Sequence, residues 1–177
     1  MTNEYLIAGF GGQGLLFAGK FLVNKGMMEG KEVSWLPSYG PEMRGGTASC
    51  SVIISDEPVG SPIVSKPNVL MVMNLPSLDK YESAVKPGGK IFLDSSLIGR
   101  KVERTDVEAY YVPATQMASD NGLSGLANMI LAGKLMKEMG DFDDEEAVIA
   151  SLKKVVSVKH PEMFEKNLQA LKLGRDY

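Results

Sequence analysis

Residues 9–14 read Gly9-Phe10-Gly11-Gly12-Gln13-Gly14, and this stretch decides the fold. A short apolar segment, Glu4 to Ala8, precedes it, and residues 15–23 are apolar at helical density. Because glycines permit positive φ angles and close backbone approach, the stretch predicts a tight turn from a buried strand into a buried helix. A second strand is expected near residues 31–36, which makes the opening a Rossmann-like βαβ unit with a right-handed crossover.

The rest of the chain alternates strand and helix patterns before it becomes helical. Further strands are expected at residues 47–55, 69–74, 90–93 and 109–112, with a short helix at 75–85. Three helices follow: one from Leu123 to near Gly140, one around residues 148–156, and a final one that Pro161 opens and that ends before Gly174. The pattern predicts an α/β fold, a three-layer, mainly parallel open sheet with helices on both faces. Residues 1–177 are expected to form a single domain.

Composition argues against several classes of function. The chain has 177 residues and a formal net charge of −3, which provides no basic surface for nucleic acid. Its apolar runs are too short to span a bilayer and no basic-then-apolar leader is recognisable, so we expect a cytoplasmic protein without a membrane partner. The single cysteine, Cys50, and single histidine, His160, are too few for a zinc site or a cysteine-ligated cluster held by this chain alone. We therefore predict no metal site and no catalytic residue; Cys50 is expected to be packed and His160 exposed.

The glycine turn also matches the G-x-G-x-x-G pattern of dinucleotide-binding proteins through Gly9, Gly11 and Gly14. Such a site needs an acidic residue about 20 positions further on to hold the ribose hydroxyls. Residues 33–38 contain no Asp or Glu, and Glu32 lies at the wrong end of its strand. Two interpretations stay open: a purely structural turn, or a turn that holds a phosphate, a cofactor or a partner's backbone at the helix N-terminus.

A second glycine-bearing segment follows the second strand: Pro37-Ser38-Tyr39-Gly40-Pro41-Glu42-Met43-Arg44-Gly45-Gly46. Ligands gather at the carboxyl edge of open α/β sheets, where this segment is expected to lie. The Arg44 guanidinium suits bidentate binding of carboxylate or phosphate. From composition alone, however, a solvated turn in which Arg44 pairs with Glu42 is the favoured interpretation.

Taken together, residues 9–14 and 38–46 closely resemble the gamma subunit of 2-oxoacid:ferredoxin oxidoreductases, which act on pyruvate, 2-oxoisovalerate or 2-oxoglutarate. The resemblance extends to Val69–Leu75, where a strand ends in Asn74, and to residues 128–133. It implies a non-redox subunit of an enzyme that converts a 2-oxoacid, coenzyme A and oxidised ferredoxin to acyl-CoA, carbon dioxide and reduced ferredoxin.

The resemblance also implies where the cofactors lie. Thiamine diphosphate, its magnesium ion and the iron–sulfur clusters are expected on partner chains, and none on this chain alone. The implied partners are alpha and beta subunits, with a ferredoxin-like delta subunit as a further candidate and ferredoxin as an indirect partner. The isolated chain is expected to be inactive and is a candidate homodimer. Selectivity among 2-oxoacids is expected to reside mainly in other chains.

A surface for coenzyme A and partner chains is the site hypothesis that follows from the resemblance. Arg44 is the candidate ligand of a coenzyme A phosphate or a partner carboxylate, whereas Asn128 is expected to be a packing residue. Two alternatives stay open: a stand-alone coenzyme A or nucleotide-binding module, and an NAD-type oxidoreductase. The candidate binding residues are Gly9, Gly11, Gly12, Gln13, Gly14, Ser38, Tyr39, Gly40, Arg44, Gly45, Gly46 and Asn74.

Replacing Arg44 with alanine tests its expected role. The variant Arg44→Ala should raise the apparent KM for coenzyme A, because the cation that would hold a phosphate is gone. Thiamine diphosphate binding should not change. Steady-state kinetics and cofactor titration of the assembled enzyme measure both quantities, and an unchanged KM for coenzyme A would remove this role from Arg44.

Overall fold

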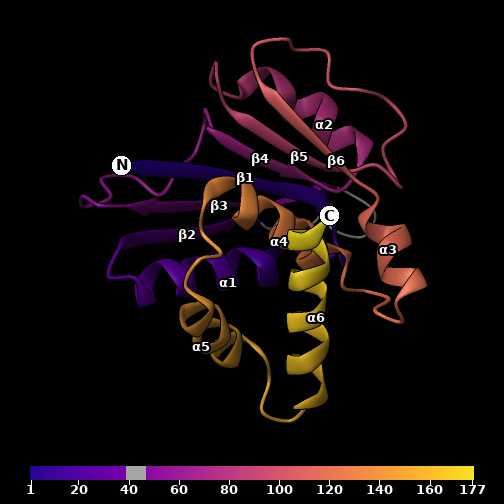
Figure 1. The fold of residues 1–177 in the computed structure, drawn as a ribbon. Coiled ribbons are helices and arrows are strands. Elements are labelled where there is room, and N and C mark those ends of the chain that lie inside the picture. Colours follow the sequence, from indigo (N-terminus) through magenta and orange to yellow (C-terminus); the bar gives the residue numbers. More distant parts are fainter. Residues whose placement is uncertain (39–46) are drawn as a thin grey trace.

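The computed structural model describes residues 1–38 and 47–177, which form a single sheet flanked by helices (Figure 1). The strands are β1 (Thr2–Phe10), β2 (Glu32–Ser38), β3 (Thr47–Ser55), β4 (Val69–Val72), β5 (Lys90–Asp94) and β6 (Glu108–Val112). The helices are α1 (Leu15–Met28), α2 (Leu75–Tyr81), α3 (Ala114–Asp120), α4 (Ala127–Met139), α5 (Glu145–Val155) and α6 (Glu162–Asp176), with a 3-10 turn, η1 (Glu82–Ala84), after α2.

The strand order in the described sheet is β2-β3-β1-β4-β5-β6. The pairs β1–β4, β4–β5 and β5–β6 are parallel, whereas β3 pairs antiparallel with both β1 and β2. The predicted mainly parallel α/β sheet is therefore confirmed. No helix among the described residues combines the length and the apolar composition needed to cross a bilayer.

The predicted opening βαβ unit is present, since β1 and β2 run in the same direction and α1 connects them, but the two strands are not neighbours. β3 lies between them, with Thr47 opposite Phe10 and Ser49 opposite Ser38. Burial gives the physical reason. β3 has buried residues along its whole length, including Val52 and Ile53, whereas β2 has no buried residue and contains Pro37, which suits an edge strand.

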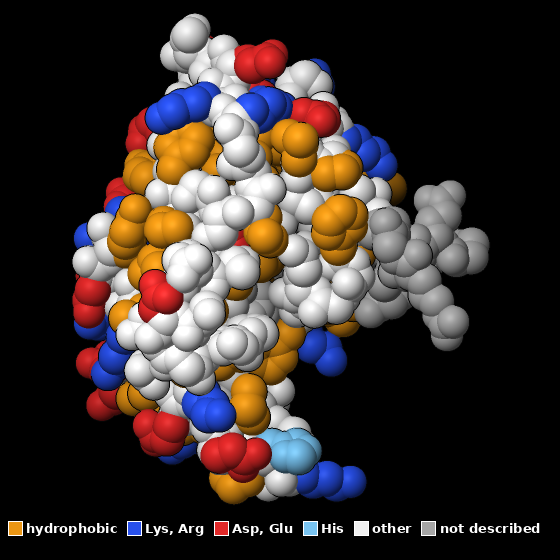
Figure 2. Space-filling model, turned by 90° about the vertical axis from the view of Figure 1, so that its right-hand side faces the viewer, with side chains coloured by type: hydrophobic (Ala, Val, Ile, Leu, Met, Phe, Trp, Pro, Cys, Tyr) orange, Lys and Arg blue, Asp and Glu red, His pale blue; other side chains and the backbone are white. Residues whose placement is uncertain are grey.

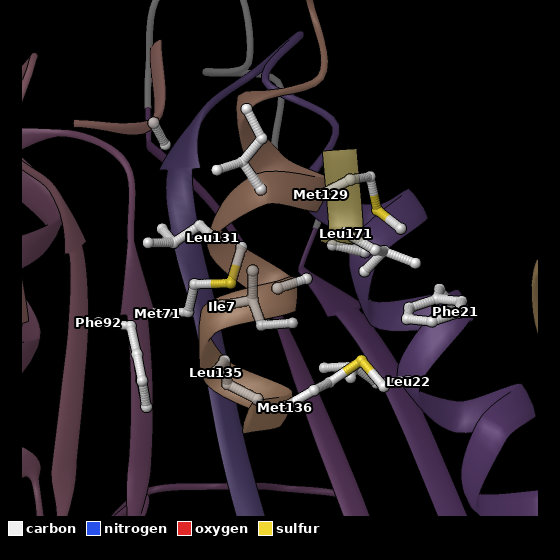
Figure 3. Packing of buried hydrophobic residues seen from close by; sticks show 14 of the residues in the cluster. Ile7, Phe21, Leu22, Met71, Phe92, Met129, Leu131, Leu135, Met136 and Leu171 are labelled. Atoms are coloured by element: carbon white, nitrogen blue, oxygen red, sulfur yellow. The ribbon is translucent and has the colours of Figure 1, made fainter. Parts of the chain in front are cut away.

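Two hydrophobic cores lie on the two faces of the sheet. Along β1, Ile7 packs in the larger core and Leu6 in the smaller one. α1, α4, α5 and α6 cover the larger core, and α2 lies on the opposite face (Figure 1). Figure 3 shows side chains of α4, including Leu131, Leu135 and Met136, packed beside Ile7 and Met71 of the sheet. The predicted three-layer arrangement is thus confirmed, although the layer that contains α2 is thin.

α4 and α6 touch through their backbones. A Cβ atom at Gly133 of α4 would lie 2.0 Å from the carbonyl oxygen of Leu171, and one at Gly174 of α6 would lie 1.7 Å from that of Ile130. No side chain fits at either crossing point. Gly174 lies inside α6, so the prediction that it follows the helix was wrong. A glycine near a helix end suggests a C-cap when its tertiary neighbours are unknown.

The other predicted elements are confirmed to within a few residues, and α3 is an addition. At 7 residues it is too short for a helical hydrophobic period to stand out in the sequence.

Gly174→Ala should destabilise the protein by about 3 kcal/mol, the upper range for overpacking a well-packed core, because its methyl group meets backbone atoms. Urea unfolding followed by circular dichroism measures the change. Gly60→Ala is the matched control, since a Cβ atom there would meet nothing within 4 Å. Equal stability of the two variants would contradict backbone contact between α4 and α6.

Candidate functional site

The glycine turn joins β1 to α1 at the carboxyl edge of the parallel strands. Gly12 (φ 90°) and Gly14 (φ 74°) adopt left-handed conformations that side chains disfavour. Gly14 is the N-cap residue of α1 and provides no capping side chain, so the first N–H groups of the helix have no intrahelical acceptor. Such a helix start stabilises an anion.

Gln13 fixes the shape of the turn through both ends of its side chain. Its Oε1 accepts a hydrogen bond from the Phe10 N–H at 2.6 Å, and its Nε2 donates to the carbonyl oxygen of Met73 at 3.0 Å. Gly9 leaves room for this bridge, because a Cβ atom there would lie 2.4 Å from Gln13 Oε1. Gln13 thus ties the turn to the chain that follows β4, and its side chain acts as a structural bridge.

Asn128, near the start of α4, closes the turn from another side. Its Nδ2 donates to the carbonyl oxygen of Gly14 at 2.9 Å, and a Cβ atom at Gly14 would lie 2.5 Å from that nitrogen. The side chain is buried, but its Oδ1 has no hydrogen-bond partner. The packing role expected for Asn128 agrees with this contact, whereas the unpartnered oxygen was not anticipated.

Two further polar side chains at this edge have structural roles. The Oδ1 of Asn74 accepts from the Ser77 N–H at 2.9 Å and caps α2. Sequence reasoning missed Asp94, which is fully buried at the end of β5. Its carboxylate accepts from the Ser96 N–H at 3.0 Å and from the Thr115 hydroxyl at 2.5 Å, which holds the start of α3 against the sheet. In the sequence, the only signal for this role of Asp94 was its position at the end of a predicted strand.

The second predicted segment begins and ends at the same edge. Because β2 and β3 are antiparallel neighbours, Ser38 at the end of β2 and Thr47 at the start of β3 both lie there, and Thr47 pairs with Phe10. The structure therefore brings the glycine turn, Ser38 and Asn74 to one side of the sheet. The other predicted site residues, Tyr39, Gly40, Arg44, Gly45 and Gly46, lie outside the described residues.

Two cavities adjoin the glycine turn. One of about 260 Å³ is lined by Phe10, Gly11, Gly12, Gly14, Leu16 and Ala48 among others, and one of about 420 Å³ by Gly12, Gln13, Met73, Leu97, Thr115 and Ser124 among others. Two exposed apolar side chains line these cavities, Phe10 at 39% and Leu97 at 47% exposure, and Leu75, 38% exposed, begins α2 after β4. Figure 2 looks onto this side of the molecule and shows hydrophobic side chains spread over it.

The described residues provide no group of three His, Cys, Asp or Glu side chains able to hold a metal ion. Cys50 is buried, and its Sγ lies 3.6 Å from the carbonyl oxygen of Leu15. Burial raises the pKa of its thiol to about 12, so the reactive thiolate is scarce at neutral pH. His160 is exposed and lies 3.3 Å from Glu162. A lone buried thiol does not fit a cluster that takes several cysteine ligands.

An open six-stranded sheet flanked by helices, with a glycine turn between β1 and α1, defines the chain as a protein of the α/β class. It belongs to the pyruvate ferredoxin/flavodoxin oxidoreductase family, whose sequence model matches residues 4–177. The resemblance drawn from residues 9–14 and 38–46 is thereby confirmed.

The relatives differ in how much of their length corresponds to this chain. Ketoisovalerate oxidoreductase subunit VorA of Methanothermobacter thermautotrophicus is 40% identical over 97% of this chain, but the chain spans only 35% of VorA. 2-Oxoglutarate synthase subunit KorC of Methanocaldococcus jannaschii is 34% identical over 97% of this chain and 95% of KorC. The crystal structure of the keto/oxoacid ferredoxin oxidoreductase gamma subunit from Geobacter sulfurreducens is 27% identical, with a TM-score of 0.82 over 98% of this chain and 96% of that one.

Gln13→Ala should lower the free energy of unfolding by about 1–2 kcal/mol, because two hydrogen bonds worth about 1 kcal/mol each are lost. Chemical denaturation measures this loss. Gln116→Ala serves as the control, since that side chain makes an exposed hydrogen bond to Asp120 and should contribute less than about 0.5 kcal/mol. If both variants unfold alike, the bridge does not hold the turn.

Proposed function

We propose that this chain is a non-redox subunit of a 2-oxoacid:ferredoxin oxidoreductase. In this role it docks on the thiamine-binding and substrate-binding chains and helps to form the path for coenzyme A. The proposal rests on the family membership and on one structural observation, the exposed apolar side chains that gather at the carboxyl edge.

Phe10 ends β1, Leu75 begins α2 shortly after β4, and Leu97 follows β5, so the three side chains come from separate parts of the chain. A single exposed apolar side chain is ordinary on a protein surface. Several exposed apolar side chains at an edge that also holds two cavities are typical of a protein–protein interface. The relatives support the same view, because this module is a separate subunit in KorC and a part of a longer chain in VorA.

The glycine turn supports a contact with coenzyme A. The N-terminus of α1 suits a phosphate group, and the backbone at Gly11, Gly12 and Gly14 lines the adjoining cavity. Gln13 and Asn74 use their side-chain oxygens internally, so they support this surface indirectly. Arg44 remains the proposed side-chain ligand of the phosphate.

The reaction chemistry is assigned to partner chains. Thiamine diphosphate would stabilise a carbanion, and iron–sulfur clusters would transfer electrons. A chain with one cysteine does not fit an iron–sulfur cluster, which takes several cysteine ligands. We propose alpha and beta subunits, with a ferredoxin-like delta subunit, as the partners. We also propose one domain over residues 1–177 and a cytoplasmic complex.

Assembly of the complex tests whether the carboxyl edge with Phe10, Leu75 and Leu97, here called the docking edge, contacts the partner subunits. Leu97→Glu should lower recovery of this chain in the complex by roughly 10-fold, because a charge in an apolar interface loses its hydration. Co-expression with the partner subunits, tag purification and 2-oxoacid-dependent reduction of ferredoxin measure assembly and activity together.

Ile63→Glu is the matched control for Leu97→Glu. Ile63 is 67% exposed and lies between β3 and β4, at the opposite edge of the sheet. Its variant should assemble normally. Normal assembly of Leu97→Glu would refute docking through the carboxyl edge, and full turnover by the isolated chain would refute the proposed function as a whole.

A further inference from the structure

A third cavity, here called the α5–α6 cleft, lies beside the glycine turn and has a volume of about 360 Å³. Its walls come from the starts of α1 and α4, the connection between α5 and α6, and the first turns of α6. The lining is mostly apolar and includes Phe17, Leu126, Val155, Val156 and Met163. Figure 2 shows the surface hollowed next to the pale-blue histidine side chain, and His160 is part of the cleft lining.

Two asparagines in the wall have buried side-chain oxygens without hydrogen-bond partners. Asn128 and Asn167 are each 2% exposed, and both line the cleft. Their amide orientations are fixed, because the Nδ2 of Asn128 donates to the Gly14 carbonyl at 2.9 Å and that of Asn167 to the Met163 carbonyl at 2.7 Å. The Oδ1 of each is left as an acceptor with no donor.

Unpartnered buried oxygens are rare in folded proteins because each loses its hydration without compensation. Two of them in the wall of one apolar cleft point to an occupant that supplies hydrogen-bond donors there. That occupant must combine apolar groups with hydrogen-bond donors, since both free positions are acceptors.

The last turn of α5 and the connection that follows it contribute Val155, Val156, Ser157 and His160 to the cleft, and their charged residues add a charge requirement. Residues 153–160 contain three lysines, Lys153, Lys154 and Lys159, and no Asp or Glu. All three are exposed, as is Val158 at 92%. One carboxylate, that of Glu162, lies 3.3 Å from His160 at the end of this segment. An occupant with acidic groups next to its apolar part would complement these lysines.

We propose that the α5–α6 cleft receives an extended, acidic segment of the partner subunit. An apolar side chain of that segment fills the cleft, and its backbone N–H groups donate to Asn128 and Asn167. An extended backbone has N–H groups to offer, whereas those of a helix are mostly used internally. This inference rests on the proposed function, because the cleft lies on the same side of the molecule as the docking edge.

The length of VorA supports a polypeptide occupant. Only 35% of its length corresponds to this chain, so further polypeptide is covalently joined to the module there. In a complex of separate subunits, non-covalent contacts must replace that connection. A cleft that adjoins the docking edge and takes an anchoring segment would serve this purpose.

Charge substitutions inside the cleft test the proposal in the assembled complex. Met163→Glu and Val156→Glu should each lower recovery of the partner subunit by roughly 10-fold, because a carboxylate would occupy the apolar site. Val158→Glu is the control, since Val158 belongs to the same connection but does not line the cleft. Thermal melting of each isolated variant verifies that it folds.

Asn167→Leu separates binding from folding. It removes an oxygen that has no partner in the isolated chain together with the Nδ2 hydrogen bond to the Met163 carbonyl, so the Tm of the isolated chain should fall by no more than about 2–4 °C, the effect of one hydrogen bond. Affinity for the partner subunit should nevertheless drop by roughly 10-fold, because a donor in the partner loses its acceptor. Hydrogen exchange should also show residues 155–167 protected in the complex relative to the isolated chain.

The outcomes distinguish this inference from the proposed function. If Leu97→Glu blocks assembly but Met163→Glu and Asn167→Leu do not, the cleft inference fails and the docking edge stands. If the cleft variants assemble normally but raise the KM for coenzyme A, the occupant is the co-substrate and a partner segment is refuted. If the unmodified chain assembles with no partner subunit, the proposed function is refuted, and the cleft inference that rests on it is refuted as well.

Discussion

The direct backbone contact between α4 and α6 is the constraint on which the rest of the structure depends. At Gly133 and Gly174 even a methyl group would collide with the facing carbonyl oxygen. α6 therefore fixes the position of α4, the most deeply buried helix. α4 in turn places Asn128 against Gly14, so a contact in the last third of the chain determines the geometry of a turn near its beginning.

The sequence predicted most elements correctly because their signals are local. The glycine turn after β1 and the apolar periodicity of α4 follow from neighbouring residues alone. The position of β3 between β1 and β2 did not follow, because a strand pattern shows that a strand exists and not which strands pair with it. The role of Gly174 was misjudged for the same reason, since its tertiary neighbours are distant in sequence.

The candidate site was predictable in location and less so in detail. Topology gathers the glycine turn, Ser38 and Asn74 at one edge, as the order of strands and loops had indicated. The hydrogen bonds of Gln13 and Asn74 were not foreseeable, because they depend on backbone atoms brought together by folding. The α5–α6 cleft was invisible in the sequence, since Asn167 resembles any polar residue of an amphipathic helix.

The central position of β1 has a consequence for biosynthesis. β1 leaves the ribosome before its partners β3 and β4, and its register pairs Thr2 with Ser55 and Tyr5 with Val69. Such long-range pairing slows folding, because a long loop must close before the contacts form. The larger core also stays open until α6 has been synthesised. The nascent chain therefore exposes apolar surface until these segments have been made, and a chaperone that covers β1 during that interval would limit its aggregation.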